Sequence, residues 1–203
     1  MDVAAKTKQK PTPERILDAA ENLFAEKGYS STSLGEVAEE VGIRSPSLYN
    51  HFENKQALYS AVMDRLLELF SKPLTELKQE ENLTAERLYQ WLGNVIRMHH
   101  KHPNLSRLLQ HAALSDGQQA NDLIKRLFSH MFDMNLEKDI LPGLGNAELR
   151  PWAAVALNNM IMSYITMAPM YRELLGEDPF SPDALEKQTG LIMKLAHLVI
   201  QNE

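Results

Sequence analysis

The chain has 203 residues, of which 44% are hydrophobic and none is cysteine. This length suits one compact unit or a small module joined to a larger one, with ample material for a core. The lack of cysteine excludes disulfides, thiolate metal sites and thiol catalysis, and the formal net charge of −6 argues at first against a nucleic-acid partner.

No segment predicts secretion or membrane insertion. The first ten residues contain no apolar stretch typical of a signal sequence. The most apolar C-terminal stretch, residues 191–200, is interrupted by Lys194 and His197 and is too short to span a bilayer. We therefore expect a cytoplasmic protein with no membrane partner.

The N-terminal 60 residues are slightly acidic, with seven Lys and Arg against nine Asp and Glu. Their basic residues are nevertheless grouped. Lys6, Lys8 and Lys10 make residues 1–12 a basic arm, which we expect to be mobile. If this region binds DNA, the acids of residues 14–40 must face away from it, because charges act over about 8–10 Å.

The first two predicted helices are separated by turn residues. Thr12-Pro13 offers an N-cap and a proline at the first helical position, and apolar residues follow at helical spacing until Gly28 ends the helix. A second, short helix is predicted from about Ser33 to the residue before Gly42.

Two further helices follow closely. The third is predicted to begin at Ser45-Pro46 and to run to Phe52. Asn54 can cap a fourth, which is predicted to end near Pro73. Its apolar stripe consists of Leu58, Val62, Leu66 and Leu69.

Longer helices are predicted in the rest of the chain, at about 84–101, 103–114, 118–140, 148–173 and 182–202. Proline- and glycine-containing segments separate them, and no stretch alternates as a strand does. The prediction is an all-α fold.

Residues 33–52 have the pattern of a helix-turn-helix, with two short helices joined by a turn at Gly42. A helix that enters a DNA groove is short and carries small or polar residues at its exposed N-terminus, as Ser45, Pro46 and Ser47 do. Leu48 and Phe52 are expected to pack inward. The side chains left facing outward, Tyr49 and His51, can donate to phosphate oxygens, and Lys55 adds a cation.

Residues 15–61 resemble the DNA-binding region of the TetR/AcrR family of transcriptional regulators. The block LYNHFENKQAL is the most specific part of the match. The other matching residues are Ala20, Leu23, Phe24, Gly28, Tyr29, Thr32, Ser33, Val37, Ala38, Val41, Gly42, Ile43 and Ser47.

The resemblance implies a three-helix DNA-binding domain, residues 13–60, followed by a helical effector-binding and dimerisation domain, residues 61–203. It implies that Ser33 contacts phosphate, that positions 44, 45 and 47 touch base edges, and that Tyr49, His51 and Lys55 hold the DNA backbone. A bidentate contact of Arg44 with guanine is our own inference. The candidate DNA-binding residues are Ser33, Arg44, Ser45, Pro46, Ser47, Tyr49, Asn50, His51 and Lys55.

The last two predicted helices carry apolar stripes. The resemblance implies that they pair with their copies in a four-helix dimer interface, and a two-fold protein suits a palindromic operator. The candidate interface residues are Trp152, Val155, Leu185, Ile192, Leu195 and Val199. The alternative is that both stripes belong to the chain's own core.

A pocket for an unknown, largely apolar effector is expected among the C-terminal helices. The ten methionines of the chain suit an adaptable apolar lining, although such residues also serve as ordinary core. The candidate lining residues are Tyr89, Trp91, His99, His111, Met131, Asn158, Met162 and Tyr164.

The histidines near residue 100 raise the possibility of a metal site. His99 and His102 can share a helix face, but the chain lacks cysteine and has no acidic ligand nearby at helical spacing. We therefore predict no metal and no cofactor.

The sequence contains none of the catalytic motifs G-x-S-x-G, H-E-x-x-H or the P-loop, so we predict that the protein is not an enzyme. We expect a homodimeric, ligand-responsive repressor that an effector releases from a palindromic operator by tilting the fourth helix. The alternative is a helical ligand-binding or adaptor protein with a vestigial helix-turn-helix, and activation instead of repression also remains open.

Overall fold

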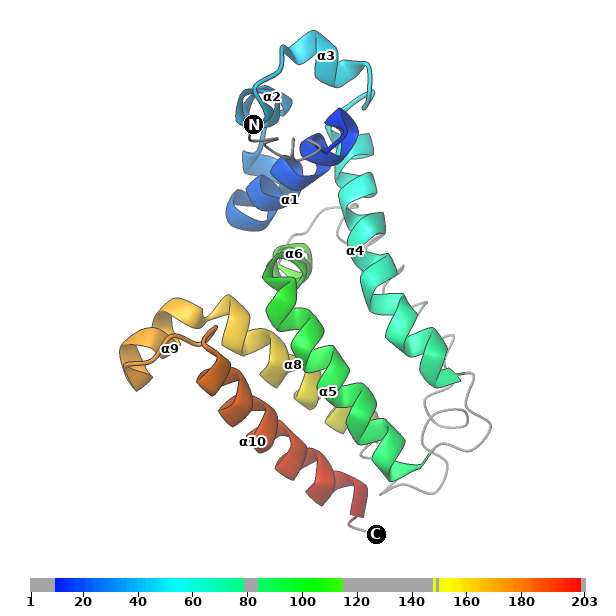
Figure 1. Cartoon of the computed structure of the whole chain (residues 1–203), viewed down its shortest axis with the longest axis vertical. Helices are drawn as coiled ribbons and strands as arrows, with labels where there is room; N and C mark the ends of the chain where they lie inside the picture. Colours follow the sequence, from blue (N-terminus) through cyan, green and yellow to red (C-terminus); the bar gives the residue numbers. More distant parts are fainter. Residues whose placement is uncertain (1–9, 79–83, 115–147, 149, 202–203) are drawn as a thin grey trace, which may run out of the picture. The chain divides into compact units, whose positions relative to one another are not determined.

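The computed structural model describes residues 10–78, 84–114, 148 and 150–201. It divides into two compact units, residues 1–65 and 66–203, and each is described here by itself. All regular elements within the described ranges are helices, which confirms the predicted all-α class (Figure 1). No helix in these ranges is long and apolar enough to cross a membrane.

The first unit contains α1 (Thr12–Ser31), α2 (Leu34–Val41), α3 (Ser45–Tyr49) and the first part of α4 (Lys55–Lys78). Its core is made of apolar side chains from all four helices, and each helix contributes at least one fully buried residue. The fully buried apolar residues are Ile16, Ala20, Phe24, Val37, Leu48, Leu58 and Val62.

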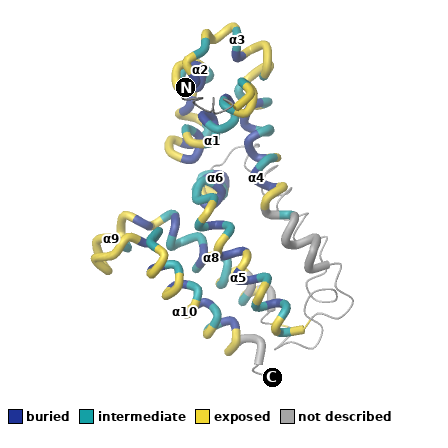
Figure 2. The backbone as a smooth tube through the Cα atoms, in the orientation of Figure 1, coloured by how far each residue is buried: buried dark blue, intermediate teal, exposed yellow. Residues whose placement is uncertain are grey.

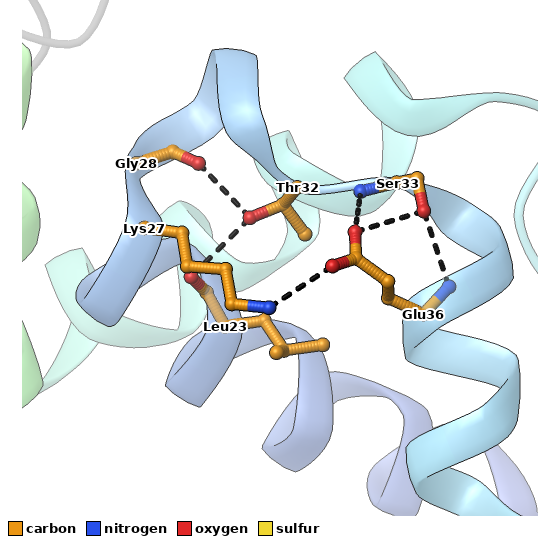
Figure 3. A network of polar contacts seen from close by, with 6 residues as sticks. All are labelled: Leu23, Lys27, Gly28, Thr32, Ser33 and Glu36. Carbon is orange, nitrogen blue, oxygen red and sulfur yellow. Dashed lines mark hydrogen bonds and ion pairs between the residues drawn. The ribbon is translucent and has the colours of Figure 1, made fainter.

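Helix α1 differs from the prediction at both ends. Thr12 is its first residue and Pro11 occupies the cap position, without a side-chain cap bond. Gly28 interrupts the helical path with φ 79° and ψ 168°, and one more turn follows it up to Ser31. The Thr32 hydroxyl fixes this exit by hydrogen bonds to the carbonyls of Gly28 (2.9 Å) and Leu23 (3.2 Å) (Figure 3).

Helix α2 lies within one residue of its predicted bounds, with Ser33 just before its first residue and Gly42 just after its last. Ser33 and Glu36 form a reciprocal capping box, which satisfies backbone N–H groups that have no partner inside the helix. Gly42 follows with φ 73°, in the left-handed region, and its N–H bonds to the carbonyls of Ala38 and Glu39. This turn separates α2 from α3.

Helix α3 is shorter than predicted, because it ends at Tyr49 and not at Phe52. The N–H groups of His51 and Phe52 both bond to the carbonyl of Leu48, which makes residues 50–52 a turn. Helix α4 is capped by Asn54, whose Oδ1 accepts from the N–H of Ala57 at 2.8 Å.

Helix α4 is longer than predicted, since it continues past Pro73 to Lys78. Its apolar stripe is one residue shorter than predicted. Leu66 is buried, but Leu69 is 37% exposed.

The described part of the second unit contains α5 (Ala85–Lys101), α6 (Pro103–Ala113), α8 (Arg150–Thr166), α9 (Ala168–Leu175) and α10 (Pro182–Gln201). A buried cluster joins α5, α8 and α10, which lie side by side (Figure 1). Its members are Leu92, Val95, Ile96, Ile161, Ile192 and Ala196.

The predictions for residues 84–101, 103–114 and 182–202 agree with α5, α6 and α10 to within one residue at each end. The helix predicted at 118–140 lies outside the described residues. A single helix at 148–173 is wrong, since α8 ends at Thr166 and α9 begins at Ala168. Pro169 lacks the N–H that would bond to the carbonyl of Ile165, and its ring would clash with that carbonyl in a continuous helix.

Two histidines tie α5 to its neighbours. His99 is fully buried, and its Nδ1 lies 2.7 Å from the hydroxyl oxygen of Ser106 on α6. Burial, with a smaller effect of His100, lowers the pKa of His99 from its ordinary 6.5 to about 4. The Nε2 of His100 lies 2.7 Å from Oε1 of Gln188 on α10, and the Gln188 amide donates to the carbonyl of Pro179.

The left-handed turn at Gly42 generates a prediction for stability. A Cβ at Gly42 would meet nothing within 4 Å, so Gly42→Ala should cost only the strain of positive φ, about 1–2 kcal/mol of unfolding free energy. Gly35→Ala, in the same α2 helix with only Ser33 Oγ at 3.8 Å, should leave stability unchanged or raise it by up to about 1 kcal/mol. Urea unfolding measures the stability of both variants. Equal effects of the two would contradict the left-handed conformation assigned to Gly42.

The buried His99 generates a prediction for pH dependence. Below pH 6.5 His99 becomes protonated in the unfolded chain, whereas in the folded chain it stays neutral until the pH approaches 4. The free energy of unfolding should therefore fall by up to about 3 kcal/mol between pH 6.5 and 4, and level off below that for this group. His99→Gln should flatten this part of the stability curve. His51→Gln, at an exposed histidine, serves as the control and should leave it in place.

Candidate nucleic-acid interface

The first unit presents most of α3 and the adjoining turn to solvent. Leu48 is the buried residue of α3, with no exposed area, whereas Tyr49 beside it is 53% exposed. Figure 2 shows the exposed positions along this segment in yellow. The exposed predicted contacts are Arg44, Ser45, Pro46, Tyr49, Asn50 and His51, while Ser47 and Lys55 are half-buried.

The local sequence explains this arrangement. Gly42 turns the chain out of α2, and Arg44 caps α3 with extended backbone. Pro46 has a fixed φ suited to the first turn of a helix, where its missing N–H costs nothing. With Leu48 as the anchor, the helix is held on one side and offers a guanidinium, a phenol, an imidazole and hydroxyl groups on the other. These are groups that bind phosphates and base edges.

Ser33 is exposed, but its polar groups are already used by the capping box. Its hydroxyl lies 2.9 Å from Glu36 Oε2 and accepts from the Glu36 N–H, while its own N–H donates to the same carboxylate at 2.7 Å (Figure 3). Lys27 also donates to Glu36 at 2.9 Å. Hydrogen bonds from Lys27 and then Ser33 lower the pKa of Glu36 to about 2. A phosphate contact by Ser33 would therefore compete with the cap of α2.

Lys55 is held at the junction of α1 and α4. Its Nζ donates to the carbonyl of Ser30 at 3.2 Å and lies 4.4 Å from the centre of the Tyr29 ring. Burial lowers its pKa from the ordinary value. The sequence pattern singled out Lys55 but missed Tyr29, because nothing in the spacing of two residues 26 positions apart indicates that they touch.

Several acids of the first unit form ion pairs inside it. Arg65 of α4 forms ion pairs with Asp18 (2.8 Å) and with Glu21, and Lys10 pairs with Asp18 at 2.7 Å. Burial alone would raise the pKa of Asp18, but the hydrogen bonds from Lys10 and Arg65 outweigh it, so its pKa is lowered. The acids paired in this way, Glu36 included, contribute little field at a distance.

The structure distributes the predicted effector residues over several environments. Tyr89 lines a surface cavity of about 450 Å³ between α5 and α10, and its hydroxyl lies 3.0 Å from His197 Nδ1. The other members of that cavity are Met193, Lys194, His197 and Leu198. His99 instead lies in the core beside Ser106.

The remaining candidates for the pocket are half-buried or not described. Trp91 and Tyr164 pack against the core cluster of the second unit. The Asn158 amide contacts the Met162 sulfur at 3.2 Å, and His111 is half-buried. Met131 lies outside the described residues.

The predicted dimer residues also separate into groups. Trp152 and Val155 of α8 are exposed, at 74% and 51%, whereas Ile192 is fully buried in the core cluster of its own chain. Leu185 and Leu195 are half-buried, and the side chain of Val199 is not described. Helix α10 exposes two further apolar residues that sequence reasoning missed, Leu191 and Leu198.

The histidines near residue 100 do not gather around a common point. His99 and His100 bond to different partners, Ser106 and Gln188. Across the described ranges, no group of three His, Asp or Glu side chains is arranged to hold a metal ion.

Comparison with known proteins finds a family match within the first unit. Residues 16–62 match the family of bacterial regulatory proteins of the tetR type. Over 83 residues the chain is 33% identical to the biofilm operon icaADBC HTH-type negative transcriptional regulator IcaR of Staphylococcus aureus, a match that covers 41% of this chain and 45% of that protein. The chain thus matches less than half the length of this curated relative.

Solved structures share the fold over nearly the whole chain. A TetR-family transcriptional regulator from Bordetella parapertussis is 17% identical, with a TM-score of 0.65 and coverage of 96% of both chains. The transcriptional regulator FadR from Bacillus subtilis, solved in complex with stearoyl-CoA, is 18% identical, with a TM-score of 0.64 and coverage of 94% of this chain and 98% of that one. Residues 16–62 thus match the tetR family of bacterial regulatory proteins, and the chain shares its fold with solved regulators.

Proposed function

We propose that the protein is a homodimeric transcriptional repressor that binds a palindromic operator through α3 and releases it when a small, largely apolar molecule binds the second unit. The observation that carries the proposal is the exposed face of α3, anchored by Leu48 and preceded by the left-handed turn at Gly42. This region matches a family of regulatory proteins and not a family of enzymes.

Repression is favoured over activation by the curated relative, since IcaR is named as a negative regulator. In this proposal the side chains of Tyr49, Asn50, His51 and Lys55 hold the DNA backbone. Arg44, Ser45 and Ser47 meet base edges, with Pro46 shaping the helix start. Ser33 acts first as the cap of α2, and its position at a helix N-terminus still suits a nearby phosphate.

Dimerisation through the second unit is supported by the apolar residues that α8 and α10 expose. Four large hydrophobic residues on these helices are between 47% and 74% exposed. They are Trp152, Val155, Leu191 and Leu198. Exposed apolar surface of this kind is typical of an interface. Ile192, in contrast, contributes to the interior of each protomer.

An apolar effector is supported by the chemistry of the second unit. Within the part of the chain that the structure describes, the buried indole N–H of Trp91 has no hydrogen-bond acceptor, and half-buried Met162 and Tyr164 lie on the neighbouring helix α8. A ligand with an apolar body and an acceptor would suit such a lining. The stearoyl-CoA complex of the Bacillus subtilis FadR is a case of a related fold that holds a ligand with a long apolar chain.

Transmission to the DNA is proposed to run through α4. This helix is continuous from Lys55 to Lys78, and the division between the two units falls within it, at Arg65. An effector with higher affinity for one tilt of α4 would shift the operator affinity, with coupling of about 1–3 kcal/mol in typical cases.

Selection of bound sites from a random duplex library tests the proposal. The unliganded dimer should enrich a palindrome, and binding should weaken steeply as salt rises. A Tyr49→Ala/His51→Ala double variant, verified as a folded dimer, should lose the enrichment. If the wild-type dimer enriches nothing even at low salt, the adaptor hypothesis with a vestigial helix-turn-helix replaces this one.

Arg44 generates a separate prediction about specificity. Arg44→Ala should relax selectivity at one base pair of each half-site by about 1–3 kcal/mol. The matched control is Arg44→Lys, which keeps the charge but cannot form the bidentate contact. It should preserve most of the salt dependence while its preference for guanine weakens. Unchanged base preference in both variants would remove Arg44 from the set of base-reading residues.

A further inference from the structure

The side chain of Lys55 has two partners in the protein without DNA. It extends from the first residue of α4 to the end of α1, where its ammonium meets the carbonyl of Ser30 at 3.2 Å and the Tyr29 ring at 4.4 Å. A surface lysine usually samples many rotamers, and fixing it upon binding costs conformational entropy. The contacts with Ser30 and Tyr29 remove much of that cost in advance.

The Tyr29 ring is itself fixed by an aromatic cluster. It stacks on Phe24, with ring centres 6.0 Å apart and planes at 23°, and meets Tyr59 edge to face at 4.9 Å. Phe24 is fully buried and Tyr59 nearly so. The ring therefore presents one constant face to the ammonium, as a cation–π contact requires.

The ammonium retains capacity for a further partner. Lysine has three N–H donors, and the Ser30 carbonyl accepts one of them. The nearby Glu36 carboxylate is already bonded to Lys27 and Ser33. The remaining donors of Lys55 thus suit an anionic oxygen from outside the chain.

We propose that Tyr29 is a positioning residue for DNA binding, which together with the Ser30 carbonyl holds the Lys55 ammonium in place for a phosphate of the DNA backbone. The inference rests on the proposed function. It adds a residue that does not touch DNA and acts through Lys55 alone.

A double-mutant cycle on the full-length dimer tests this, with the operator obtained by site selection as the probe. Lys55→Met should weaken binding and reduce the slope of log K against log salt by about one for each phosphate that the lysine neutralises. Tyr29→Leu keeps an apolar side chain in the cluster but removes the ring. It should weaken binding by about two- to fivefold per DNA-binding unit, the size expected of one exposed cation–π contact.

The effect of Tyr29→Leu is measured both in the wild-type protein and in the Lys55→Met protein. This comparison distinguishes a positioning role from a merely structural one. Tyr29→Leu should have no further effect on operator affinity in the Lys55→Met protein, and Tyr29→Phe, which keeps the ring, should rescue binding. Lys187→Met, which removes a lysine paired with Glu177 in the second unit, controls for loss of charge and should leave the salt slope intact. Thermal unfolding monitors the packing of each variant.

Each outcome bears on the proposal. Equal losses from Tyr29→Leu with and without Lys55 would mean that Tyr29 only stabilises the fold, and would overturn it. Wild-type affinity and slope in Lys55→Met would overturn it while leaving the proposed function intact. Failure of the wild-type dimer to select any operator would overturn the proposed function and this inference together.

Discussion

Helix α3 depends on the burial of one leucine. Leu48 is fully buried, while the residues before and after it on α3 are partly or largely exposed. A five-residue helix has too few hydrogen bonds to be stable alone, so its conformation comes from this tertiary contact and from the turns at both ends. Loss of the anchor would remove the surface on which the proposed function depends.

Electrostatics around this surface are arranged by pairing. The chain is acidic overall, and its N-terminal 60 residues are too, yet Asp18, Glu21 and Glu36 each have a cationic partner within the first unit. Each pair cancels a cation together with its acid and leaves the net charge unchanged, so the groups of α3 must attract an anion through their own local donors.

Most of the first unit could be predicted from the sequence because its signals are local. Ser33 and Gly42 marked the approximate ends of α2, and Asn54 marked the start of α4. The long-range contacts could not be predicted: Arg65 pairs with Asp18 and Glu21, more than 40 residues away, and Lys55 contacts Tyr29.

The break between α8 and α9 had a visible signal in Pro169, but the apolar periodicity continues past it and suggested one helix. Ile192 was a candidate for the dimer interface but lies in the core of its own chain, since an apolar stripe alone does not distinguish core from interface.

The length of α4 has a mechanical consequence. At 1.5 Å per residue, its 24 residues form a rod about 36 Å long. A pivot of about 5° at one end of such a rod displaces the other by about 3 Å, close to the 3.4 Å rise of one DNA base step. A movement of this size is comparable to that of a side chain changing rotamer. At the DNA-binding end of α4 it would shift the protein by about one base step along the double helix.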